Sequence, residues 1–160
     1  MLDRTKKLSE HFTLGELTNT QYKTSDGNEP PLEAVENLIS ICQFWLEELR
    51  AIYNRSYVKE EKEEGIIINQ GFRSYQVMME MKKAGLNPSK TSNNMRGCAV
   101  DIRCKDKQQA YRYMMILKRM SEKNGKDFDE LFLERSGTTY WVHFAVRPSN
   151  NRKKIRYLLG

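Results

Sequence analysis

Apolar residues recur at steps of three and four between residues 31 and 53, and this spacing predicts a long helix with one buried face. Pro31 suits the first turn of that helix because its ring fixes φ and it has no amide hydrogen to leave unpaired. The same spacing predicts a second long helix over residues 107–123. Between the two helices, the charged run 59–64 is typical of a solvated loop or hairpin tip.

Two shorter elements are indicated by capping residues. Thr13 and Glu16 have the spacing of a capping box, which predicts a short helical element near the N-terminus. Ser74 follows a turn and is placed to cap a helix over residues 75–84. Gly85 is the expected end of that helix, because glycine adopts the left-handed conformation common after a last helical turn.

Short apolar runs bounded by turn residues predict buried strands. Four runs have this form, at residues 65–69, 98–102, 129–135 and 140–147. The last two are joined by a tight connection and predict a hairpin. The order of helices and strands therefore predicts one α+β domain over residues 1–160, with a small antiparallel sheet flanked by helices. Residues 1–30 are expected to form an N-terminal arm of this domain, and residues 150–160 a basic tail.

Composition narrows the class of protein. The chain has 160 residues, enough for one domain with a real core, and its 39% hydrophobic and 30% charged residues are typical of a soluble globular protein. No segment has the length and apolarity of a membrane span or a signal peptide, so we expect cytoplasmic synthesis. The three cysteines lack metal-type spacing and are expected to be buried, reduced thiols. The net charge of +6 favours an anionic partner such as nucleic acid, a membrane surface or a bacterial wall.

Asp101 is the first candidate for chemistry. It lies in the apolar run 98–102, and a carboxylate there is costly to bury unless a cation, a metal or hydrogen-bond donors meet it. His143 lies at the centre of another apolar run and is the best available partner. Taken singly, each residue also has an ordinary structural explanation, as an ion pair for Asp101 and as a hydrogen-bonded core side chain for His143.

Four stretches, in this order and spacing, resemble the zinc peptidases that cut D-alanyl peptides of bacterial cell walls. They are Gly71-Phe72-Arg73-Ser74, residues 92–101, residues 128–134 and Trp141-Val142-His143, and the resemblance extends from Leu8 to Arg152. This family includes D-Ala-D-Ala carboxypeptidases, the vancomycin-resistance dipeptidases and phage endolysins. It shares its fold with the Hedgehog signalling domain, so the resemblance implies a Hedgehog/D-Ala-D-Ala peptidase-like domain.

The resemblance also implies a role for each matching residue. Asp101 and His143 would be zinc ligands, and Glu134 would be the general base that takes a proton from zinc-bound water. Arg73 would grip the carboxylate at the C-terminus of the substrate. Ser92 and Trp141 match the family's motifs beside the ligands and would contact the substrate.

Asn94 departs from the family pattern, because it stands where the first histidine ligand is expected. Imidazole is a far better donor to zinc than a neutral amide oxygen, so zinc binding should be weak or absent. Asn94 could still coordinate weakly through its carbonyl oxygen, or through water. The segment after Arg73, from Met78 to Lys90, also differs from the family's usual sequence.

Two functions therefore stay open. One is a peptidoglycan-directed zinc metallopeptidase, a D,D-carboxypeptidase or endopeptidase such as a phage endolysin, released by a lysis partner or carried in a phage particle. The other is a metal-free peptidase fold that serves as a binding or structural module. The first would act on a bacterial cell-wall peptide, and the second would recognise wall peptides or another protein. For both we expect a monomer and no membrane contact. Nucleic acid is not the expected partner, since the basic tail lacks the interleaved aromatic residues of a stacking groove.

Overall fold

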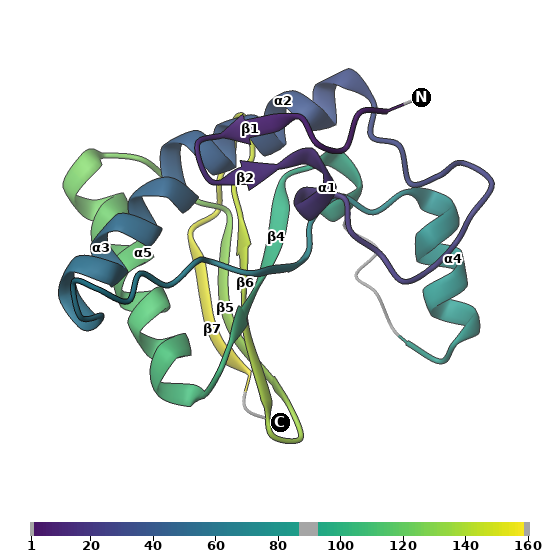
Figure 1. The fold of residues 1–160 in the computed structure, drawn as a ribbon. Helices are drawn as coiled ribbons and strands as arrows, with labels where there is room; N and C mark the ends of the chain where they lie inside the picture. The colour runs from purple at the N-terminus through teal and green to yellow at the C-terminus, as the bar shows by residue number, and fades with distance from the viewer. Residues whose placement is uncertain (1, 87–92, 159–160) are drawn as a thin grey trace.

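The computed structural model describes residues 2–86 and 93–158 (Figure 1). The helices are α1 (Leu14–Leu17), α2 (Leu32–Ile41), α3 (Glu47–Tyr57), α4 (Tyr75–Lys83) and α5 (Lys107–Asn124), with a π-helical segment η1 (Cys42–Leu46) and a 3₁₀ turn η2 (Asn94–Arg96). The strands are β1 (Lys7–Ser9), β2 (Phe12–Thr13), β3 (Ile68–Gln70), β4 (Ala99–Cys104), β5 (Glu130–Ser136), β6 (Thr139–Ala145) and β7 (Lys154–Leu158).

The main sheet has five strands in the order β3-β4-β6-β5-β7. Its neighbours are antiparallel except for β5 and β7, which run parallel, while β1 and β2 form a separate antiparallel pair. The α+β class is confirmed, but the expectation of a purely antiparallel sheet was wrong. The basic tail contributes β7, and the N-terminal arm contains β1 and β2. These strands were not predicted, because they are too short for their alternation to stand out in the sequence.

The helices divide between the two faces of the sheet. In Figure 1, α3 and α5 lie on one side of the strands and α4 lies on the other. The face toward α5 is apolar, because alternate residues of a strand point to opposite faces. Its central side chains are at most 1% exposed; they are Val100, Ile102, Leu131, Leu133, Val142 and Phe144. The other face is therefore left with the polar members of the same strands.

Most predicted elements are confirmed, with shifts of one to three residues at most boundaries and a larger one at the end of the first helix. Both the capping box at Thr13 and the Ser74 cap are present. The first long helix contains the π-helical segment η1 and continues to Tyr57 rather than ending near residue 53. The strand predicted at residues 65–69 is shorter and begins at Ile68. α5 matches the predicted 107–123 almost exactly in place, ending one residue later at Asn124.

Gly97 fixes the turn that precedes β4. Its φ is +71°, and a Cβ added there would lie 2.3 Å from the carbonyl oxygen of Ala34 in α2. Only glycine meets both conditions without strain. This close approach anchors η2 against α2 and so sets where Asn93 and Asn94 lie, ahead of β4.

Two further expectations concern burial. All three cysteines, Cys42, Cys98 and Cys104, are buried and free, as predicted. Burial raises the pKa of the Cys104 thiol to about 12, so this thiol is inert at neutral pH. Among the helices of residues 2–86 and 93–158, none has the length and apolar character needed to cross a membrane.

Candidate functional site

A pocket of about 580 Å³ opens on the polar face of the sheet. Its floor is formed by alternate residues of the three central strands, and α4 and the segments around it supply a wall that includes Arg73, Met81 and Asn94. The floor residues are Asp101, Glu130, Phe132, Glu134, Trp141 and His143. The structure thus brings together candidates that lie as far apart in the sequence as Arg73 and His143.

The strand register explains this gathering. Asp101 of β4 lies directly opposite His143 of β6, and His143 lies opposite Phe132 of β5. Two residues further along each strand, Trp141 of β6 lies directly opposite Arg103 of β4 on one side and Glu134 of β5 on the other. Directly opposed residues have neighbouring Cβ atoms, so the two rows place acids, imidazole and aromatic rings in contact on one face.

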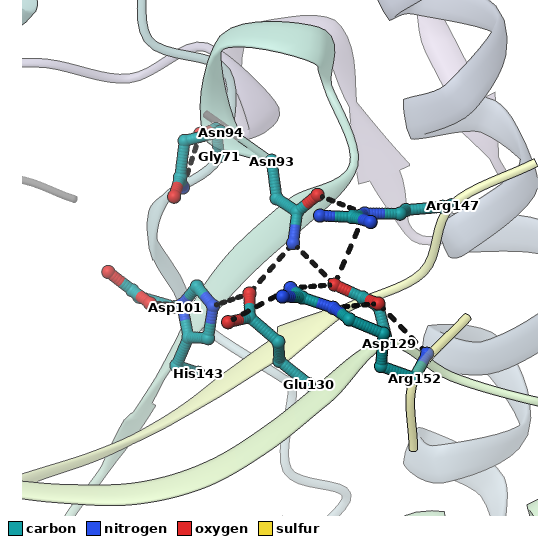
Figure 2. Close-up of polar contacts among 9 residues, drawn as sticks. All are labelled: Gly71, Asn93, Asn94, Asp101, Asp129, Glu130, His143, Arg147 and Arg152. Atoms are coloured by element: carbon teal, nitrogen blue, oxygen red, sulfur yellow. Dashed lines mark hydrogen bonds and ion pairs between the residues drawn. The ribbon is translucent and has the colours of Figure 1, made fainter. Parts of the chain in front are cut away.

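His143 is held between two carboxylates. Its Nδ1 lies 2.9 Å from Oδ1 of Asp101, and its Nε2 lies 3.1 Å from Oε1 of Glu130 (Figure 2). The ring also stacks on Phe132, with a centroid distance of 5.5 Å and an interplanar angle of 28°. Burial by itself lowers the pKa of His143, but the two carboxylates outweigh burial and raise that pKa to about 10. Without a metal, the ring is therefore an imidazolium that donates from both nitrogens.

Behind Glu130 lies a second cluster, built around Asp129. This side chain is fully buried and is bonded by two arginines, Arg152 (Nη2 to Oδ2, 2.7 Å) and Arg147 (Nε to Oδ2, 3.2 Å). Burial alone would raise the pKa of Asp129, but the donors from Arg152, Asn93 and Arg147 hold it well below its usual range. The carboxylate is therefore charged throughout the physiological range of pH.

Asn93 links this cluster to the pocket. Its amide nitrogen donates to Asp129 (2.9 Å) and to Glu130 (2.7 Å), and its amide oxygen accepts from Nε of Arg147 (2.9 Å; Figure 2). The orientation of the amide is fixed, since each end meets a partner of the right kind. Asn93 therefore holds Glu130 in the position from which Glu130 contacts His143.

Glu134 lies in the same pocket, two residues beyond Phe132 on β5. Burial raises the pKa of this carboxyl, and the nearby charge of Asp101 raises it further. A carboxyl with a raised pKa next to a charged one is a common arrangement for a group that accepts and returns a proton.

Arg73 is a buried cation in the wall of the pocket, with 8% of its surface exposed. Within the described part of the chain, its Nε has no hydrogen-bond partner, and no carboxylate oxygen lies within 4.0 Å of its guanidinium. Its Nη1 contacts the Met81 sulfur at 3.4 Å. Burial lowers the pKa of Arg73 and the charge of Asp101 raises it, but a guanidinium stays protonated in proteins. Among the described residues this buried guanidinium is incompletely bonded, which is costly, so it could donate hydrogen bonds to an anionic group.

Asn94 is buried at the edge of the pocket, and its amide nitrogen donates to the carbonyl of Gly71 at 3.1 Å. With the nitrogen held in this way, the amide oxygen lies on the side toward Asp101, as Figure 2 shows. Trp141 lines the pocket as expected. Ser92, the remaining candidate, lies outside the described residues.

The donor set does not fit a tightly held zinc ion. Asp101 and His143 supply two good donors from neighbouring strands, and the third is the amide oxygen of Asn94. In residues 2–86 and 93–158, no three histidine, cysteine, aspartate or glutamate side chains are arranged to hold one metal ion. A zinc site normally uses at least three strong protein donors, so the pocket as it stands falls one donor short.

Comparison of the chain with models of known protein families, with curated protein sequences and with solved structures found no match. The case for a function therefore depends on the residues of the site.

Glu130 and Asn93 are the site residues that the sequence analysis missed. A signal for Glu130 was present, because it lies four residues before Glu134 on a predicted strand and so on the same face. Asn93 gave no comparable signal, since its contacts depend on how the turn at Gly97 packs against α2.

The two hydrogen bonds from His143 to Asp101 and Glu130 predict an unusual titration of this ring. In the metal-free protein, the ring should be fully protonated at pH 7 and should lose its proton only near pH 10. Because the pKa in the folded state lies above the usual 6.5, these two contacts add to the free energy of unfolding. Their contribution is complete below pH 6.5 and is lost as the pH rises through about 10. Nitrogen-15 NMR of the imidazole rings measures this directly, with His11→Gln used to assign the two histidines.

Glu130→Gln should move the His143 titration to lower pH, whereas Glu122→Gln, an exposed change on α5, should leave it in place. A neutral His143 ring at pH 7 in the unaltered protein would contradict the double hydrogen bond.

Proposed function

We propose that the chain is a peptidase-fold protein that binds the free C-terminal carboxylate of a bacterial cell-wall peptide in this pocket. The observation that carries the proposal is the buried guanidinium of Arg73, which faces the pocket without a carboxylate partner in the described residues. A planar guanidinium matches a carboxylate with two parallel hydrogen bonds, and burial strengthens them.

The rest of the pocket suits a peptide better than a lone anion. Phe132 and Trp141 offer apolar surface for small side chains such as those of alanine. Asp101 and Glu134 are acceptors for the amide hydrogens of a bound backbone, and their negative charge disfavours a second acid at that point. A ligand with one carboxylate at its end and an uncharged backbone behind it meets both demands.

The resemblance to the D-alanyl peptidases supports the choice of ligand, and it remains a resemblance. The matching residues include the arginine that holds the terminal carboxylate in that family. The proposal keeps this recognition step and does not require a metal, because the donor set falls one ligand short of a firm zinc site.

Arg73→Gln should weaken the binding of acetyl-Lys-D-Ala-D-Ala by at least about tenfold, since a hydrogen bond to a charged group contributes about 1.5–3 kcal/mol. Isothermal titration calorimetry measures the dissociation constant. The matched control is Arg55→Gln, the same change at an exposed position of α3, which should bind like the unaltered protein.

The same peptide with an amidated C-terminus should bind the unaltered protein as weakly as the free acid binds Arg73→Gln. Equal affinity of the acid and the amide would contradict carboxylate recognition.

Zinc-dependent hydrolysis of the same peptide is the second candidate, and the contact between Glu130 and His143 favours it. Histidine ligands of metals usually donate their second ring hydrogen to a carboxylate, which leaves the other nitrogen for the metal. Glu130 occupies that position at Nε2, so Nδ1 and Asp101 would face a metal together. The raised pKa of Glu134 also suits a general base.

Asn94→His should convert the pocket into a zinc site, because it would supply the third strong donor. We expect zinc affinity to rise at least about 100-fold and peptide hydrolysis to start or to increase strongly. Equilibrium dialysis with elemental analysis measures bound zinc, and the release of D-alanine measures hydrolysis. Asn19→His, at an exposed position away from the pocket, controls for the added histidine.

Adding His143→Ala to Asn94→His should abolish the gain in zinc affinity. No gain with Asn94→His would contradict the ligand assignment of Asp101 and His143. Hydrolysis by the unaltered protein that resists chelators would contradict the zinc-dependent candidate.

A further inference from the structure

A second pocket, of about 650 Å³, adjoins the first. The two share Asn69 and Thr139 in their walls, so they lie next to each other at this end of the sheet. A ligand longer than the part bound in the first pocket could therefore reach the second.

Arg103 lines the second pocket together with two other charged residues, Glu64 and Lys105. It follows Asp101 by two residues on β4, so it lies on the same face of the sheet, and it is exposed. In the described residues, no carboxylate oxygen lies within 4.0 Å of its guanidinium. The acid in the wall of this pocket, Glu64, forms an ion pair with Lys105, with Nζ of Lys105 3.4 Å from Oε1 of Glu64. The second pocket therefore has an excess of positive charge.

From the register of β3 with β4, we infer that Arg73 and Arg103 lie on opposite sides of the Asp101–His143 pair along the strand direction. β3 runs antiparallel to β4 with Gln70 opposite Asp101, so the chain leaving β3 toward Arg73 moves away from Arg103. A strand advances about 3.3 Å per residue, so the backbone of Arg103 lies about 7 Å beyond that of Asp101 along β4. An extended peptide anchored at Arg73 would therefore bring its third or fourth residue, counted from its C-terminus, to Arg103.

We propose that the second pocket binds a side-chain carboxylate of the same peptide, borne by the third or fourth residue from its C-terminus, through Arg103. This inference rests on the proposed function and specifies its ligand as an acidic peptide with two anchors. The acids of the first pocket lie between the two arginines, so charge complementarity sets the order acid, neutral backbone, acid along the ligand.

The test compares peptides that differ in one charge. Acetyl-Glu-D-Ala-D-Ala and acetyl-Glu-Gly-D-Ala-D-Ala are each paired with the analogue in which glutamine replaces glutamate, and all four are titrated calorimetrically at one ionic strength. The unaltered protein should bind the acidic member of at least one pair about fivefold more tightly. Arg103→Gln should remove that preference without changing the affinity for the glutamine peptides. Arg55→Gln, the exposed control on α3, should retain the preference.

The possible failures are distinct. If all four peptides bind in an Arg73-dependent way with no preference for glutamate, the second anchor is wrong and the proposed function stands. An equal loss of affinity for acidic and neutral peptides in Arg103→Gln would also overturn the anchor, because it indicates a structural role. If no peptide binds the unaltered protein, the proposed function and the second anchor fall together.

Discussion

The register between β4 and β6 is the constraint on which the candidate site depends. It sets Asp101 opposite His143, and a slip of one residue would turn both side chains toward the helices and expose their apolar neighbours. The buried face makes such a slip costly, since Val100 and Phe144 are paired in the core by the same register. The core packing that stabilises the fold thus also fixes the position of Asp101 relative to His143.

The Asp129 cluster extends this coupling to the chain that follows β6. Arg147 and Arg152, which lie on either side of the turn into β7, both bond to one buried carboxylate. A buried charge is tolerated only when it is fully paired, so the cluster holds the last strand in place while Asn93 connects it to Glu130. The outcome is a rigid support behind His143. The opposite wall is different, because there Arg73 is buried and its Nε has no hydrogen-bond partner among the described residues.

The sequence predicted those parts of the molecule whose signal is local. Helical spacing found α5, capping residues found α4, and an acid inside an apolar run pointed to Asp101. The missed parts depend on contacts between distant segments. The five residues of β7 become a strand only because β5 offers a free edge, and Asn93 acquires its role from a turn that packs on α2. Glu130 lies between these cases, since alternation along β5 indicated its face but not its contact with His143.

We have proposed that Arg73 anchors a carboxylate of the ligand, since no carboxylate of the described residues pairs with its guanidinium. The most direct test is a crystal structure of the unaltered chain with acetyl-Lys-D-Ala-D-Ala. The account predicts both oxygens of the terminal carboxylate within hydrogen-bonding distance of the Arg73 guanidinium, with the unfilled Nε now bonded. A terminal carboxylate bound elsewhere, with Arg73 turned into an ion pair with Asp101, would contradict it.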